Sequence, residues 1–198
     1  MPSPPWSRPK PPKRAAEVKA ETARRAAAFS SAMAACEAGD AFYADCLDKM
    51  GAKVEYAPSS ITVTGPPEGT KLKGVDVDCI KIPDAAMTLA SVALVAEGTT
   101  TIRNVGSWRV KETERMKAIV AETSKFGADV TEQPTTCIIK PPTEIKPMCE
   151  IETSDDHRIA MTFALAACAG VPVKILDPGC TSKTFPTYFD ALKEVCTE

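Results

Sequence analysis

The chain has 198 residues, of which 44% are hydrophobic, and its formal net charge at pH 7 is −2. This length allows one domain, or two small ones, with a hydrophobic core, and the nearly balanced charge excludes a general attraction to nucleic acid or anionic membranes. The longest uncharged apolar run, residues 159–173, is shorter than the roughly 20 residues that a membrane-spanning helix requires.

Residues 1–40 differ in composition from the remainder. The first twelve residues contain six prolines, which predicts an extended tail, and residues 14–36 are rich in alanine and arginine, which predicts a helix. We therefore interpret residues 1–40 as an extension of a domain that spans residues 41–198. An Arg- and Ala-rich targeting peptide is the alternative interpretation of this extension.

The sequence after the extension contains a weak internal duplication. The segment KMGAKV at 49–54 returns as KFGADV at 125–130, and AMTLASVAL at 86–94 returns as AMTFALAAC at 160–168. Because the two copies keep the same order, the sequence predicts two structural units of one kind.

In each copy the residue pattern predicts, in chain order, a helix that ends at a glycine, two short strands, a third strand, a second helix and a fourth strand. The first helices are expected to stop at Gly51 and Gly127, because glycine readily adopts the left-handed conformation that ends a helix. Short apolar runs predict the paired strands at 54–56, 61–64, 130–132 and 137–140.

The second helix of each copy is apolar on every side. In DAAMTLASVALVAEG and in IAMTFALAACAG the uncharged positions surround the helix, and such a helix must be buried. The sequence thus predicts an α/β domain in which small sheets surround internal helices. Repeat architectures of this kind usually need about three units, so a third unit is expected to be missing from the chain.

The apolar helix of the second copy begins at SDDHR, residues 154–158. Asp155 or Asp156 is expected to cap its N-terminus, and a catalytic role is the alternative for either. His157, the only histidine, is either a hydrogen-bonded structural residue or a chemical one. Arg158 gains nothing from the positive end of a helix dipole, so its presence indicates that an anion binds there.

Two shorter stretches carry one candidate residue each. In IPDAAMT, residues 82–88, Asp84 is expected either to cap the apolar helix of the first copy or to act as a base at the edge of a cleft. In DPGCTSKTFPTYF, residues 177–189, the absence of the second glycine before the lysine argues against a nucleotide-binding loop. Lys183 can still hold a phosphate as a point charge.

A single helix is predicted for residues 107–128, SWRVKETERMKAIVAETSKFGA. Lys111 and Arg115 are four residues apart and would share one face of this helix, where two like charges favour an anion between them. A solvated helix in which Glu112 and Glu114 neutralise these cations explains the pattern equally well.

Four stretches, IPDAAMT, SWRVKETERM, DDHRIAMTFALAACAGVPV and LDPGCTSKTFPTYF, resemble in order and spacing the C-terminal domain of the 5-enolpyruvylshikimate-3-phosphate synthase family. The similarity extends from about residue 42 to about residue 195 and is strongest to plant and algal forms. It implies an enolpyruvate transferase-like fold of βαβαββ repeats around internal helices, with the active site between two domains. This chain would contain about two of the three repeats of the C-terminal domain.

The resemblance implies transfer of the enolpyruvyl group of phosphoenolpyruvate to the 5-hydroxyl of shikimate 3-phosphate, within the shikimate pathway, without metal or cofactor. Asp84 would accept the proton of the attacking hydroxyl, and Glu112 would handle the proton at the vinyl carbon. Asp156 and His157 would hold the substrate-binding side chains in place without contacting the substrates themselves. The contacts themselves would come from Ser107 and Lys111 for shikimate 3-phosphate, and from Arg115, Arg158 and Lys183 for phosphoenolpyruvate.

Family members also carry an N-terminal domain that completes both substrate sites, and its motifs do not occur in this sequence. The chain is therefore expected to be part of an enzyme that works with a separate N-terminal half. A truncated, inactive fragment or an anion-binding module is the alternative. The UDP-N-acetylglucosamine enolpyruvyl transferase shares the fold, but WRVKETER and DDHR argue against it.

The eight cysteines are scattered without a C-x-x-C pair, which predicts reduced thiols and an intracellular protein. Together with the likeness to plant forms, this implies a location in the plastid or the cytoplasm. The expected partners are the two substrates and the separate half of the enzyme, with no nucleic acid and no membrane.

The isolated chain is expected to show negligible turnover, because half of a cleft neither excludes water nor holds two substrates from both sides. Phosphate release from phosphoenolpyruvate and shikimate 3-phosphate by the purified chain measures this directly. Activity near that of an intact synthase would contradict the expectation.

Overall fold

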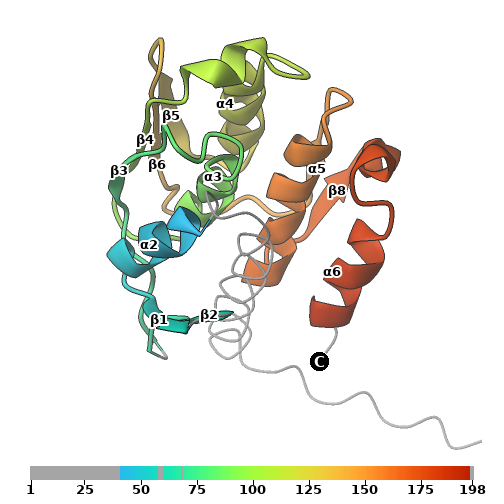
Figure 1. The fold of residues 1–198 in the computed structure, drawn as a ribbon. Coiled ribbons are helices and arrows are strands. Elements are labelled where there is room, and N and C mark those ends of the chain that lie inside the picture. The colour runs from blue at the N-terminus through green and yellow to red at the C-terminus, as the bar shows by residue number, and fades with distance from the viewer. Residues whose placement is uncertain (1–40, 58–59, 68, 197–198) are drawn as a thin grey trace, which may run out of the picture.

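The computed structural model describes residues 41–57, 60–67 and 69–196, which are drawn in colour in Figure 1. The tail and helix expected within residues 1–40 lie outside the described residues.

The two copies found in the sequence fold as two similar units. The first contains α2 (Phe42–Lys49), β1 (Lys53–Ala57), β2 (Ser60–Thr64), β3 (Asp76–Asp78), α3 (Met87–Ala93) and β4 (Thr100–Arg103). The second contains the 3₁₀ helix η1 (Gly106–Val110), α4 (Arg115–Lys125), β5 (Asp129–Glu132), β6 (Cys137–Lys140), β7 (Cys149–Ile151), α5 (His157–Ala164), the 3₁₀ helix η2 (Leu165–Ala169) and β8 (Val173–Ile175). The 3₁₀ helix η3 (Pro178–Lys183) and α6 (Tyr188–Cys196) follow.

The predicted helix stops and paired strands are confirmed. Gly51 and Gly127 follow α2 and α4 with φ of 96° and 92°, a conformation that glycine adopts without strain. The four predicted strands lie within β1, β2, β5 and β6. Local sequence patterns were therefore sufficient to locate these elements.

Three small sheets are formed by the same pairing rule in both units. Strands β1 and β2 form an antiparallel hairpin, and β3 pairs with β4 in parallel across α3. In the second unit β5 and β6 are antiparallel, and β7 pairs with β8 in parallel across α5. Because β6 also pairs with β4, the units share a four-stranded sheet of order β3-β4-β6-β5.

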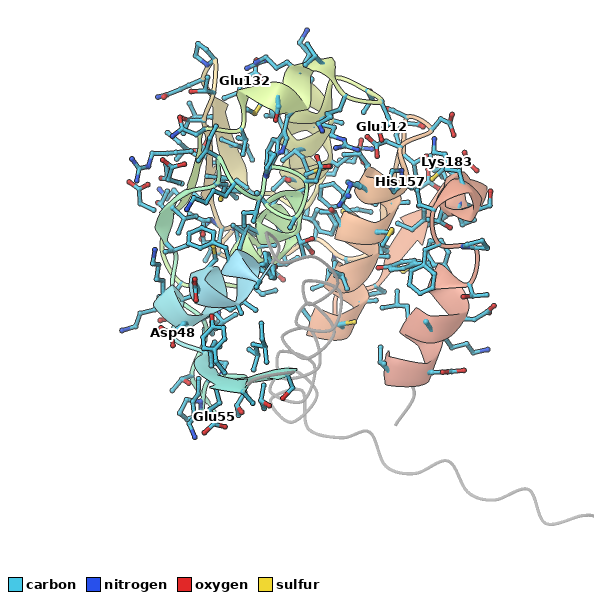
Figure 2. The ribbon with its side chains drawn as sticks, in the orientation of Figure 1. Asp48, Glu55, Glu112, Glu132, His157 and Lys183 are labelled. Atoms are coloured by element: carbon cyan, nitrogen blue, oxygen red, sulfur yellow. The ribbon has the colours of Figure 1, made fainter. Side chains whose placement is uncertain are left out.

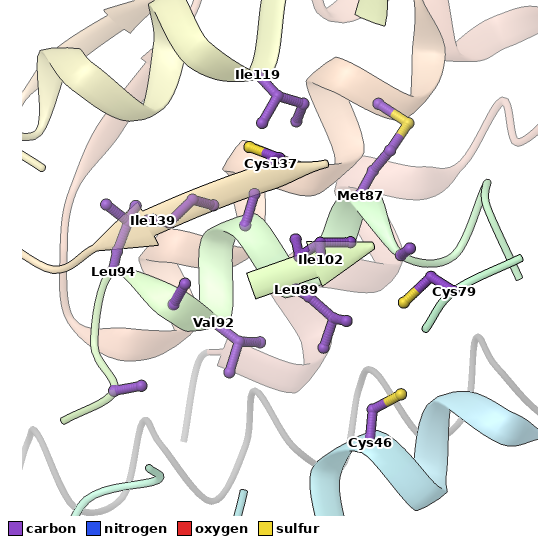
Figure 3. Packing of buried hydrophobic residues seen from close by; sticks show 14 of the residues in the cluster. Cys46, Cys79, Met87, Leu89, Val92, Leu94, Ile102, Ile119, Cys137 and Ile139 are labelled. Carbon is purple, nitrogen blue, oxygen red and sulfur yellow. The ribbon is translucent and has the colours of Figure 1, made fainter. Parts of the chain in front are cut away.

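Helix α3 is enclosed as its apolar sequence predicts. It contacts strands β4 and β6 on one side and helices α4 and α5 on the others, and Figure 1 shows it between the four-stranded sheet and α5. Its side chains Leu89 and Val92 belong to the same buried apolar cluster as Ile102 and Ile139 of the sheet, and all four are labelled in Figure 3. The predicted α/β fold with small sheets around internal helices is confirmed.

Helix α5 is the second internal helix. Its buried side chains include Ile159 and Phe163, and the ring of Phe163 stacks on Phe126 at a centroid distance of 6.0 Å. Helix α6 packs against the end of α5 and against η2 through a smaller apolar cluster that contains Ala164, Leu165 and Tyr188. Within the described residues, no helix combines the length and hydropathy required to cross a membrane.

Replacement of Phe163 by alanine tests how far the fold depends on this helix. Phe163→Ala should lower the free energy of unfolding by about 3–5 kcal/mol, because it removes a fully buried ring and leaves a cavity. Val110→Ala is the control, since Val110 is 83% exposed and its loss should change stability by less than about 0.5 kcal/mol. Urea denaturation measures both variants, and equal effects would contradict this description of the core.

Candidate functional site

The N-terminus of α5 is shaped by a tight turn. Ser154 and Asp155 both have positive φ, 52° and 53°, and the N–H of Asp156 donates to the carbonyl of Thr153 at 2.9 Å. This turn delivers Asp156 to the cap position, where its Oδ1 accepts from the N–H of Arg158 at 2.8 Å. The capping prediction is therefore confirmed for Asp156, whereas Asp155 has no cap bond and its side chain is 82% exposed.

The predicted continuous helix over residues 107–128 is wrong. Helix η1 ends at Val110, Lys111 has an extended backbone, and α4 begins only at Arg115. Glu114 causes the second start, because its side chain caps α4 by accepting from the N–H of Lys117 at 3.1 Å and also holds Arg109 at 3.0 Å. Lys111 and Arg115 therefore do not share a helix face.

Arg115 is fully buried at the first position of α4. Its Nε and Nη2 donate to the two carboxylate oxygens of Asp156, at 2.7 and 3.2 Å. Its Nη1 donates to Asp84 at 3.0 Å, and Nη2 also donates to Glu112 at 2.6 Å. A buried guanidinium is stable only when carboxylates compensate its charge, so this residue draws three acidic side chains together.

Asp84 does not cap α3, and that expectation is wrong. The cap position belongs to Ala86, which has no side-chain hydrogen bond. The carboxylate of Asp84 instead lies 3.3 Å from Lys111 Nζ, 3.0 Å from Arg115 Nη1 and 3.6 Å from Arg158 Nη2. These cations attract the carboxylate more strongly than the first turn of a short helix, whose partial charge is only a fraction of a unit.

The pKa of Asp84 follows from this arrangement. Partial burial raises the pKa of the carboxyl, but the positive charges of Arg158, Arg115 and Lys111 outweigh burial and hold the pKa below its usual range. Asp84 is therefore ionised at neutral pH and acts as a counterion for all three side chains.

Figure 2 shows His157 and Lys183 at the same end of the molecule as Glu112. Burial lowers the pKa of His157, which favours the neutral imidazole, and its Nδ1 has no hydrogen-bond partner among the described residues. Lys183 Nζ donates to the carbonyl of Asp155 at 2.6 Å, which ties η3 to the turn before α5. Ser107 lies half-buried in η1.

One contact that holds the site together was missed by the sequence analysis. The indole Nε1 of the buried Trp108 donates to the carbonyl of Pro83 at 2.6 Å. This bond fastens η1, which precedes Lys111, to the turn that carries Asp84. A buried tryptophan usually finds a hydrogen-bond partner, but its position in the sequence does not reveal which carbonyl that will be.

Two cations of the cluster are partly open to solvent. Lys111 and Arg158 are about one-third exposed, so an incoming anion reaches them directly and competes with Asp84. The residues that the structure describes contain no group of three or more His, Cys, Asp or Glu side chains placed to hold a metal ion.

Comparisons with known proteins agree with the fold. The family model for EPSP synthase (3-phosphoshikimate 1-carboxyvinyltransferase) matches residues 31–192. The chain is 57% identical over 161 residues to the chloroplastic 3-phosphoshikimate 1-carboxyvinyltransferase of Brassica napus, covering 79% of this chain and 31% of that protein. It is 52% identical over 157 residues to the 3-phosphoshikimate 1-carboxyvinyltransferase of Colwellia psychrerythraea, covering 79% of this chain and 36% of that protein.

Solved structures share the architecture at lower sequence identity. An EPSP synthase from Acinetobacter baumannii superposes with a TM-score of 0.63 at 24% identity, covering 87% of this chain and 45% of that one. The enolpyruvyl transferase NikO from Streptomyces tendae gives 0.60 at 21% identity, covering 78% and 35%. The chain thus spans about a third of the length of the curated relatives reported above.

Neutralising Asp84 tests whether it competes with anions for these cations. Asp84→Asn should raise the affinity for inorganic phosphate about threefold to tenfold at neutral pH, because partly exposed ion pairs no longer have to be broken. Asp76→Asn is the matched control, since Asp76 pairs with the exposed Arg103, which is not part of the cluster. Titration calorimetry measures the three proteins, and an unchanged or lower affinity of Asp84→Asn would contradict the competition.

Proposed function

The chain belongs to the EPSP synthase family, and from this premise we propose that it forms part of a 3-phosphoshikimate 1-carboxyvinyltransferase. The reaction joins the enolpyruvyl group of phosphoenolpyruvate to the 5-hydroxyl of shikimate 3-phosphate and releases inorganic phosphate. The observation that carries the proposal is the cluster of Asp84, Lys111, Arg115 and Arg158, which gathers residues from three separate motifs at one end of α4 and α5.

The cations are proposed to bind the two phosphorylated substrates. Phosphoenolpyruvate carries a carboxylate and a phosphate, and shikimate 3-phosphate adds further negative charge, so the substrates repel each other unless several cations lie between them. Arg158 and Lys183 are accessible and are assigned to phosphoenolpyruvate, together with Arg115 behind them. Lys111 and Ser107 are assigned to shikimate 3-phosphate.

Asp84 and Glu112 are proposed as the two catalytic carboxylates. Asp84 would accept the proton of the attacking 5-hydroxyl, and Glu112 would handle the proton at the vinyl carbon. The cations that lower the pKa of Asp84 make it a weak base. A substrate anion that pairs with the accessible Arg158 would weaken this effect and so strengthen the base when both substrates are bound.

The function is proposed to require more protein than this chain supplies. The curated relatives reported above are about three times as long as the matched region, so a second protein part is inferred to complete the substrate sites. Because the relative from Brassica napus is named chloroplastic, we propose the plastid as the location. The family match favours this activity over that of the UDP-N-acetylglucosamine enolpyruvyl transferase.

Mixing the chain with the separately produced N-terminal half of the Brassica napus relative tests this function. Phosphate release that requires both substrates is the expected result. Glu112→Gln should lower the rate by a factor of about 100 or more, as for the loss of a general acid or base. Glu144→Gln, an exposed loop position, is the control.

A failure of the unaltered chain to bind phosphoenolpyruvate in the mixture, or equal rates for the two glutamine variants, would contradict the proposal. A pull-down of the second half from extracts of the source organism adds an independent check.

A further inference from the structure

Asp156 joins the first turns of two helices through one carboxylate. It is fully buried, and both of its oxygens accept from Arg115, through Nε at 2.7 Å and through Nη2 at 3.2 Å. Its Oδ1 also accepts from the backbone N–H of Arg158 at 2.8 Å. A single side chain therefore fixes the guanidinium at the start of α4 and the backbone at the start of α5.

We propose that Asp156 is a positioning residue that holds the buried Arg115 guanidinium and the helix end carrying Arg158 in the relative orientation that anion binding at Arg158 requires. This inference rests on the proposed function only for the identity of the anion, phosphoenolpyruvate. Asp156 is assigned no contact with the substrate itself.

The fork-shaped contact explains why the orientation is fixed. A carboxylate that receives two N–H groups of one guanidinium determines the plane of that group as well as its position. Arg115 has five N–H donors, and four of them bond to Asp156, Asp84 and Glu112. The edge that bears Nη1 is thereby directed toward Asp84, on the side where Arg158 also lies.

The cap fixes the second arginine through the backbone. Arg158 is the second residue of α5, and its N–H is one of the donors that the helix leaves unsatisfied. The preceding turn holds Asp156 rigidly, because Ser154 and Asp155 adopt left-handed conformations that only a well-determined surrounding maintains. The helix end and the arginine on it thus move together with Asp156.

Replacing Asp156 by asparagine separates the two contacts. Asparagine caps helices as well as aspartate does, so the bond to Arg158 is retained. Its amide has a single acceptor oxygen and no charge, so it cannot accept both Nε and Nη2 of Arg115. If anion binding depends only on the helix cap, Asp156→Asn leaves it unchanged. If it depends on the paired contact with Arg115, Asp156→Asn weakens it.

Asp156→Asn should lower the affinity for phosphoenolpyruvate about tenfold or more, as expected for the loss of a charge-assisted contact that orders a binding group. Glu114→Gln is the matched control, because it makes the same chemical change at the cap of α4, where the partner is Arg109 instead of Arg115. Both variants should lose stability, but only Asp156→Asn should lose affinity. Equal affinity losses, or none for Asp156→Asn, would overturn the proposal.

A double-mutant cycle with Arg115→Lys distinguishes a positioning role of Asp156 from a merely structural one. Lysine cannot form the fork, so adding Asp156→Asn to Arg115→Lys should change the affinity by no more than about twofold. Independent, additive losses would show that Asp156 does not act through Arg115. They would contradict the proposal even if both single variants bind poorly.

The ¹⁵Nε signal of Arg115 tests the orientation without any ligand. In the unaltered protein its Nε–H should exchange with water at least about tenfold more slowly than that of the exposed Arg103, and Asp156→Asn should abolish this protection. Equal exchange rates of the two arginines in the unaltered protein would overturn the proposal. This comparison remains valid even if Asp156→Asn does not fold.

Inorganic phosphate as a second probe separates this inference from the proposed function. If the unaltered chain binds phosphate but not phosphoenolpyruvate, the proposed function fails, while a loss of phosphate binding in Asp156→Asn still supports the positioning role. If both ligands bind equally well to the unaltered chain and to Asp156→Asn, the positioning role fails and the proposed function stands.

Discussion

The burial of the Arg115 guanidinium is the constraint around which the site is organised. A positive charge without solvent access is stable only beside carboxylates, and three of them approach from separate segments: Asp84 before α3, Glu112 before α4 and Asp156 at the cap of α5. Removing the guanidinium would leave the buried Asp156 carboxylate without its charged partner. The ion-pair network therefore links the ends of three helices as well as forming the candidate site.

The internal helices make this arrangement rigid. Helices α3 and α5 are enclosed by sheets and other helices, so charged side chains are accommodated at their ends and not along their lengths. At the offset of 74 residues that relates the two copies, Asp84 corresponds to Arg158. The side chains at these equivalent positions carry opposite charges, and Asp84 Oδ2 lies 3.6 Å from Arg158 Nη2. The duplication therefore supplies both partners of this ion pair.

Local patterns and family resemblance predicted different parts of this structure. Glycines with left-handed backbones and apolar strands located α2, α4 and the paired strands, because these features depend on residues close in sequence. The internal duplication placed Asp84 and Arg158 at equivalent positions, and the resemblance added Lys111 and Arg115 to the same site. The continuous helix through Lys111 and the capping role of Asp84 were predicted wrongly. Glu114 caps a second helix start after Lys111, and cations from other segments hold the Asp84 carboxylate away from α3.

The sequence by itself determined that two apolar helices must be buried, that charged residues stand at their ends, and to which family the motifs are similar. It determined these because burial, helix stops and motif order are encoded by residues near one another. Only the tertiary structure decided that Asp84 is a shared counterion and that Asp156 holds both a guanidinium and a helix cap. Those roles depend on distances of about 3 Å between side chains from different elements, and such distances exist only after the units have packed.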